Sequence, residues 1–159
     1  MYMYPGVKAG PRFRRFRSRE ARMTDDTALW RDVVAVHARV EQRLSTALQR
    51  GHGLGLSEYR ALAELAPAPK GERRMQELAD ALGLNQSSVT RLVNRLHDAG
   101  FTYRDVCADD RRGVYTVLTD DGRRRHAEAR TTYDTTLTEA LGELTEDEAL
   151  GKVMRRLRG

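Results

Sequence analysis

The hydrophobic residues of this chain recur at the spacing of amphipathic helices over most of its length. Near the N-terminus they return every three or four residues and form one apolar stripe, which consists of Leu29, Val33, Val36, Val40, Leu44 and Leu48. This spacing predicts one long helix from about Thr27 to Gln49, ended by the glycines Gly51 and Gly53. A second helix is expected to begin with Ser57 as its N-cap and to stop before Pro67, with 67–71 as a loop.

The C-terminal part of the chain repeats the helical spacing. A long helix is expected from Thr119 to about residue 144, with the stripe Ala127, Arg130, Tyr133, Leu137, Leu141 and Leu144. Thr145 and Glu148 have the spacing of a capping box, and we expect them to open a last helix. The apolar residues of that last helix are Ala149, Val153, Met154 and Leu157.

Two short helices on either side of a glycine turn are predicted in the middle of the chain. Leu78, Ala79 and Leu82 form one face of the first helix, and Gly83 follows where a helix often ends in a left-handed residue. Asn85 is a favourable N-cap for the second helix, which runs from about Gln86 to Ala99 and closes at Gly100. The pair has the pattern of a helix-turn-helix.

The second helix of this pair has one apolar and one polar face. Its apolar face consists of Val89, Leu92, Val93 and Leu96. The opposite stripe and its flanks carry small hydroxyls, an amide and guanidinium groups, namely Ser87, Arg91, Asn94 and Asp98 with Ser88, Thr90 and Arg95. Hydroxyls bond phosphates or base edges, asparagine suits adenine, and arginine suits guanine or phosphate. A solvated surface helix is the alternative, but the turn before it and the hairpin after it favour DNA recognition.

A β-hairpin is predicted directly after these helices. Strands are expected at 101–106 and 114–118, separated by acidic residues, two arginines and Gly113. Arg111 and Arg112 at the tip suit a narrow, electronegative minor groove, and Asp110 can orient them. The alternative is a solvated loop with an internal Asp–Arg pair of little energetic value. The predicted fold is mainly α with a small β-wing, a winged helix-turn-helix.

These motifs resemble those of the MarR family of bacterial winged helix-turn-helix regulators. The resemblance covers roughly residues 27–158. It rests on Leu78-Ala79 before Leu84, on the run from Ser88 to Leu96 with Gly100, and on the wing pattern of Asp110, Arg112, Val117, Thr119 and Gly122. Asn94 departs from the family pattern, which has an acidic residue after the Leu-Val pair of the recognition helix.

The resemblance implies a homodimer that binds a pseudo-palindromic operator, in most members as a repressor released by a small molecule or an oxidant. In the family the first and last helices interlock between subunits, so the expected dimerisation residues are Leu29, Val33, Val36, Val153 and Leu157. Each recognition helix would enter a major groove and each wing would approach a minor groove. The expected DNA-binding residues are Gln86, Ser87, Ser88, Thr90, Arg91, Asn94, Arg95, Asp110, Arg111 and Arg112.

The length of 159 residues favours one domain. Within it, segments 23–55 and 120–159 are expected to serve dimerisation, and 56–119 to form the DNA-binding lobe. Family members tend to bind effectors in a cleft between these parts. Candidates for effector contacts are Trp30, His37, Tyr59 and His126, and each can equally be a packing residue.

The net charge of +5 is concentrated in residues 1–22, which carry seven basic residues against Glu20 alone. The remaining residues, 23–159, have 21 basic and 22 acidic residues, so attraction to DNA must come from local patches there. The segment 1–22 contains Pro5, Gly6, Gly10 and Pro11, and we expect a disordered basic tail. It is either an arm that grips phosphates or a non-native extension upstream of a start at Met23.

Other functions have little support in the sequence. Cys107 is a single cysteine, which fits a reducing cytoplasm, and it has no activating neighbour that would suggest a redox role. The four histidines lack metal-site spacing, and no catalytic constellation or cofactor motif is recognisable, so no metal, cofactor or enzyme activity is expected. No apolar run reaches the length of a membrane span, and no secretory signal is visible. The alternative function is a winged-helix protein-interaction module without specific DNA binding; the near-neutral 23–159 supports it, and the polar helix face argues against it.

Overall fold

The computed structural model describes residues 11–106 and 114–158, with side chains for 25–105 and 114–156. It divides into two compact units. The winged-helix unit is Val40–Gly142, and the terminal unit combines the two ends of the chain, up to Arg39 and from Glu143. The boundary between them falls inside two long helices.

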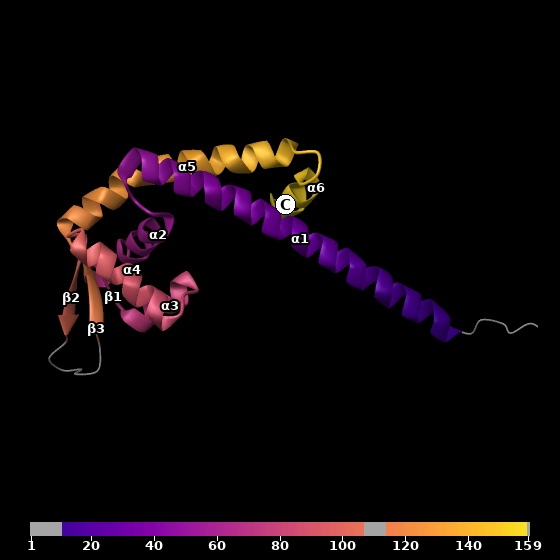
Figure 1. Cartoon of the computed structure of the whole chain (residues 1–159), viewed down its shortest axis with the longest axis horizontal. Helices are drawn as coiled ribbons and strands as arrows, with labels where there is room; N and C mark the ends of the chain where they lie inside the picture. Colours follow the sequence, from indigo (N-terminus) through magenta and orange to yellow (C-terminus); the bar gives the residue numbers. More distant parts are fainter. Residues whose placement is uncertain (1–10, 107–113, 159) are drawn as a thin grey trace, which may run out of the picture. The chain divides into compact units, whose positions relative to one another are not determined.

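The first helix, α1, runs from Pro11 to His52 (Figure 1). It is longer than the predicted Thr27–Gln49 and includes residues 11–22 of the segment for which we expected a disordered tail. Proline is favoured in the first turn of a helix, arginine is a good helix former, and no glycine or proline interrupts the chain between Pro11 and Gly51. Residues 1–10 of the expected tail lie outside the described part.

The winged-helix unit contains three short helices, a three-stranded sheet and most of a second long helix. Its elements are α2 (Leu56–Leu65), the 3₁₀ turn η1 (Pro69–Gly71), β1 (Glu72–Arg74), α3 (Met75–Leu82), α4 (Gln86–Asp98), β2 (Thr102–Val106), β3 (Val114–Leu118) and α5 (Asp120–Glu146). The sheet is antiparallel with the order β1-β3-β2. This confirms the predicted winged helix-turn-helix fold. The structure adds the turn η1, which lies within the expected loop 67–71, and the strand β1, which follows that loop.

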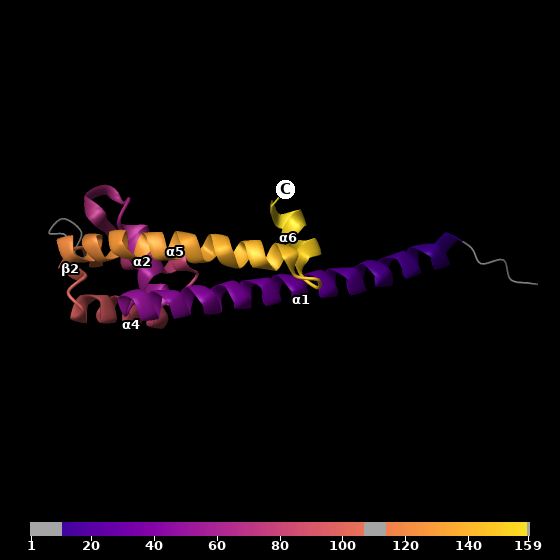
Figure 2. The same ribbon diagram turned by 90° about the horizontal axis from the view of Figure 1, so that it is seen from above.

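The core of the winged-helix unit joins all of its helices. The side chains of Leu44 and Leu48 from α1, Leu62 and Leu65 from α2, Leu78 from α3, and Val89, Leu92, Val93 and Leu96 from α4 are at most 1% exposed. The last turns of α1 lie beside α5 in both views (Figures 1 and 2), where His52 Nε2 is 2.8 Å from Thr132 Oγ1. The core therefore fixes α4 on its apolar face and leaves the opposite face outside.

The turns around α4 follow the predicted local chemistry. Gly83 and Gly100 both have left-handed backbones, with φ of 63° and 74°. The Asn85 side chain caps α4 by accepting a hydrogen bond of 2.9 Å from the Ser88 N–H. The expected cap at Ser57 is wrong, because α2 begins at Leu56 and its N-cap is Gly55, two residues earlier than expected.

The terminal unit ends in a short helix, α6 (Gly151–Arg158). The predicted capping box from Thr145 does not form, because α5 continues to Glu146. Asp147 takes its place and accepts the N–H groups of Ala149 and Leu150, each at 2.9 Å. Its other oxygen accepts a hydrogen bond of 2.6 Å from Arg39 Nη1, and together these bonds hold the pKa of Asp147 below its ordinary value.

Candidate nucleic-acid interface

The outer face of α4 is polar from its first turn. Gln86, Ser87 and Arg91 are exposed, and Ser88 and Thr90 are half-buried at the flanks. Among the described residues, Arg91 forms no ion pair with a carboxylate. Its guanidinium therefore offers all of its donors to a ligand outside the chain.

Two hydroxyls on this face already donate hydrogen bonds within α4. Ser87 Oγ donates to Asn85 Oδ1 at 2.9 Å, and Thr90 Oγ1 donates to the Gln86 carbonyl at 2.7 Å. A hydroxyl has one proton and two lone pairs, so each of these oxygens presents only acceptor capacity. They can receive a hydrogen bond from an amino group of adenine or cytosine without losing an internal bond.

Arg95, near the end of α4, is engaged with a neighbouring helix. Its Nε donates to Glu58 Oε1 on α2 at 2.9 Å, while Glu58 Oε2 accepts the Gly55 N–H at 2.8 Å. The carboxylate thus caps α2 and holds Arg95 at the same time. An exposed pair of this kind is worth at most about 1 kcal/mol, but it directs Arg95 toward α2.

Asn94 is bonded to the wing. Arg104 of β2 donates from Nη2 to Asn94 Oδ1, and both residues are exposed. Asparagine reads adenine by using its oxygen and its nitrogen together. The oxygen is occupied here, so this contact competes with the base-reading role expected for Asn94.

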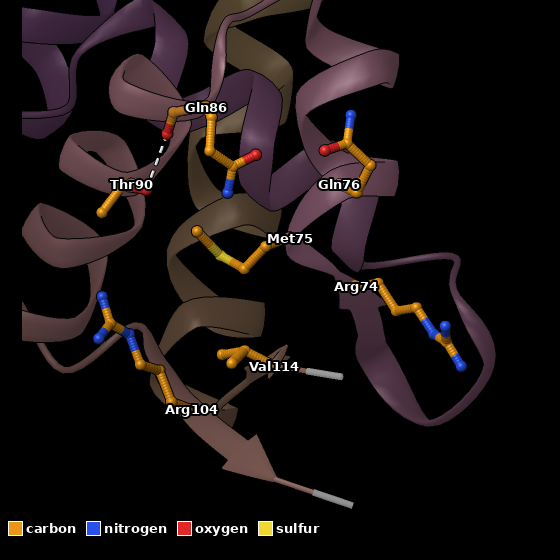
Figure 3. Close-up of a pocket in the computed structure, with 7 residues that line it drawn as sticks. All are labelled: Arg74, Met75, Gln76, Gln86, Thr90, Arg104 and Val114. Carbon is orange, nitrogen blue, oxygen red and sulfur yellow. Dashed lines mark hydrogen bonds between the residues drawn. The ribbon is translucent and has the colours of Figure 1, made fainter. Parts of the chain in front are cut away.

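A groove of about 420 Å³ lies between the start of α3, the start of α4 and the wing strands (Figure 3). Five of its seven lining residues are of polar types. The lining residues are Arg74, Met75, Gln76, Gln86, Thr90, Arg104 and Val114. In Figure 3 Arg104 extends toward α4, whereas Arg74 turns away. Arg74 Nε donates instead to the Tyr115 hydroxyl at 2.8 Å, and its guanidinium lies over that ring.

Sequence reasoning did not identify Arg74 or Arg104. Strand alternation was the available signal for Arg104, because residues two positions apart lie on the same face of a strand. Arg104 therefore shares a face with Thr102, which the structure shows to be buried. No comparable signal existed for Arg74, since β1 is short and wholly polar.

The expected wing contacts Asp110, Arg111 and Arg112, and also Cys107, lie outside the described residues.

The four effector candidates divide between the two units. Tyr59 and His126 belong to the winged-helix unit and are stacked, with ring centroids 5.4 Å apart, and Tyr133 lies 4.5 Å from Tyr59 on the same cluster. Burial raises the pKa of Tyr59 and lowers the pKa of His126; the arginines Arg130 and Arg123 add to the second shift, and Asp134 opposes it. Trp30 and His37 belong to the terminal unit, where both are exposed.

The expected dimerisation residues differ in exposure. Leu29 is 39% exposed, whereas Val36 and Val153 are buried within their own chain. Val33 is half-buried, and the side chain of Leu157 lies outside the described part. Two apolar side chains on this part of α1 are more exposed than Leu29, namely Trp30 at 68% and Val34 at 46%.

Within the described residues, no helix is both long and apolar enough to cross a membrane. The same part of the chain contains no group of three or more His, Cys, Asp or Glu side chains arranged for a metal ion.

Comparison with known proteins agrees with this architecture. Residues 52–113 match a model of the MarR family. Sco3205, a MarR family transcriptional regulator of Streptomyces coelicolor solved in complex with DNA, is 27% identical with a TM-score of 0.71, over 85% of this chain and 86% of that protein. AbsC, a MarR family transcriptional regulator of the same organism, is 28% identical with a TM-score of 0.67, over 82% of this chain and 92% of its own. Together with the winged helix-turn-helix fold, these matches support a MarR-family regulator.

Proposed function

We propose that this chain is a DNA-binding transcriptional regulator that acts as a homodimer on a pseudo-palindromic operator. The observation that carries the proposal is the division of α4 into a face that is at most 1% exposed and an opposite face with Gln86, Ser87 and Arg91 exposed. The DNA complex of the similar protein Sco3205 supports it. A helix held by its apolar face on a helix-turn-helix core is suited to enter a major groove.

The α4 face combines two kinds of contact. Arg91 suits the O6 and N7 acceptors of guanine or a phosphate, and the oxygens of Ser87 and Thr90 suit base amino groups. Phosphate contacts supply most of the affinity and position the protein, while base contacts supply specificity. From the sequence alone, Asp110, Arg111 and Arg112 add a wing contact in or near the minor groove.

Dimer formation is supported by the apolar surface of α1. Leu29, Trp30 and Val34 are exposed in the single chain, and a second copy would bury them across a two-fold axis. Two recognition helices related by that axis would match two operator half-sites. The dimer part of the proposal therefore relies on Trp30 and Val34 as well as Leu29, and less on Val36 and Val153.

The regulatory part of the proposal is repression that a small molecule relieves. The aromatic stack of Tyr59, His126 and Tyr133 in the winged-helix unit supports an aromatic or apolar effector near it. Trp30 and His37 stay as effector candidates on sequence grounds.

A titration by fluorescence anisotropy tests DNA binding. The full chain is mixed with a duplex from the region upstream of its own gene and with a scrambled duplex, at several salt concentrations. We expect tight binding to the first duplex only, with a steep salt dependence. Arg91→Ala should weaken this binding by about 1–3 kcal/mol, roughly fivefold to 150-fold.

Arg130→Ala is the matched control, because it also removes one exposed guanidinium but lies on α5, paired with Asp134. It should leave the affinity within about twofold of the wild type. Weak and equal binding of the wild-type protein to both duplexes would contradict the proposal and favour the protein-interaction module.

A further inference from the structure

The contact between Asn94 and Arg104 links the recognition helix to the wing by a bond with only one charged partner. Arg104 Nη2 donates to Asn94 Oδ1, and the two residues belong to α4 and β2. We propose that Arg104 is a further phosphate contact of the DNA interface and that Asn94 is the residue that positions it. This inference rests on the proposed function.

The register of the sheet determines the face on which Arg104 lies. Arg104 is paired with Thr116 of the central strand β3, and Thr116 is fully buried with its Oγ1 3.3 Å from Met75 Sδ on α3. Cross-strand partners share one face of a sheet, so Arg104 lies on the face covered by α3 and α4. It is nearer the open end of the wing than Thr102, which is buried on the same face, and it reaches the rim of the groove beside Thr90 and Gln86 (Figure 3).

The amide at position 94 leaves the charge of Arg104 uncompensated. A carboxylate in its place would form an ion pair and cancel most of the attraction to a phosphate. Among the described residues, no acidic side chain is within ion-pair distance of Arg104. Asp105 is its neighbour in sequence, but successive side chains of a strand point to opposite faces.

Arg104 keeps donors for DNA while it is held. A guanidinium has five N–H groups, and the bond to Asn94 uses one of them. Fixing the long side chain in advance also lowers the conformational entropy lost when a phosphate binds. Arg104 would thus add positive charge at the groove, while Arg91 supplies it on the exposed face of α4.

The roles of the two residues can be separated by a double-mutant cycle in the full chain. Arg104→Ala, Asn94→Ala and the double variant are titrated with the upstream duplex and with the scrambled duplex, at 50–300 mM salt. We expect Arg104→Ala to weaken binding to both duplexes by a similar factor, roughly tenfold, and to lower the slope of log K against log salt by about 0.9 per protomer. Asn94→Ala should cause a smaller uniform loss, and none in the Arg104→Ala background, because it acts through Arg104.

Any of four results would overturn the inference. Arg104→Ala with unchanged affinity and salt slope would remove the phosphate contact. Additive losses in the cycle would show that Asn94 acts independently of Arg104. An Asn94→Ala variant that changes discrimination at one base pair would show that Asn94 reads a base. A wild-type protein that fails to prefer the upstream duplex would overturn the proposed function as well. Thermal melting of each variant, expected within a few degrees of the wild type because both residues are exposed, confirms that folding is intact.

Discussion

The winged-helix unit and the terminal unit differ in how far a single chain buries the large apolar side chains of their helices. In the winged-helix unit, Leu44, Leu62 and Leu92 are at most 1% exposed within a single chain. In the terminal unit, Trp30 and Val34 are 68% and 46% exposed. The winged-helix unit also exposes Tyr103 at 47% and Val114 at 42%, but both lie on the wing strands rather than on a core helix. A single chain therefore covers the core helices of the first unit but leaves apolar surface on α1 in the second.

The difference lies in which face of α1 is covered. Val36 is 7% exposed, whereas Trp30 and Val34 are 68% and 46% exposed. Trp30 and Val34 are four residues apart and therefore share one face of the helix, which differs from the face of Val36. From Val36 onward the periodic stripe of α1 is thus covered within the chain, whereas Leu29 at its start, with Trp30 and Val34, stays exposed. Surfaces of this kind on a helix are typical of interaction sites.

The largest expected effect is a loss of stability when the core of the winged-helix unit is truncated. Leu92→Ala removes a side chain that is 1% exposed and leaves a cavity under α4. We expect a decrease of about 2–5 kcal/mol in the free energy of unfolding, measured by urea denaturation. A loss below 1 kcal/mol would show that α4 is not held by this core.

The second effect concerns association. If Trp30 is buried between two copies, Trp30→Ala should weaken the dimer by about 1.5–3 kcal/mol, tenfold to a hundredfold in the dissociation constant. Analytical ultracentrifugation over a concentration series measures this constant. The melting temperature of Trp30→Ala should then depend on protein concentration less strongly than that of Leu92→Ala, because a weaker dimer is less populated at the same concentration. Dissociation constants equal to the wild type would place the dimer interface elsewhere.

The sequence predicts those features that depend on neighbouring residues. The caps and turns at Gly83, Asn85 and Gly100 follow from local backbone chemistry, and the two faces of α4 follow from its periodicity. β1 could not be found in this way, because its residues Glu72–Arg74 have no apolar alternation and form a strand only by pairing with β3.

The candidate site shows the same limit. Periodicity places Asn94 and Arg95 on the outer face of α4 but does not reveal what they contact. Arg95 meets Glu58, 37 residues earlier in the chain, and Asn94 meets Arg104 across a turn and a strand. Each contact depends on how separate elements pack, so only the structure distinguishes the free Arg91 from its engaged neighbours.

The smallest expected effect is a difference in the response of the two units to pH. Burial, with Arg130 and Arg123, lowers the pKa of His126 from 6.5, although Asp134 opposes the shift. The unfolded chain therefore gains a proton at this residue before the folded chain does, and stability should decrease as pH falls below about 6.5. His126→Gln should remove this part of the decrease, measured as melting temperature from pH 7.5 to 5.

Asp147 of the terminal unit provides the matched comparison. Two backbone N–H groups and Arg39 lower its pKa from 3.8, so the stabilisation it provides is complete above that value and is lost only as pH falls below it. Asp147→Asn should therefore leave the slope between pH 7.5 and 5 unchanged, while His126→Gln flattens it. If both variants kept the wild-type slope of melting temperature against pH, the acid sensitivity would come from neither residue. The folded protein would then bind a proton at His126, stacked on Tyr59, as readily as the unfolded chain does.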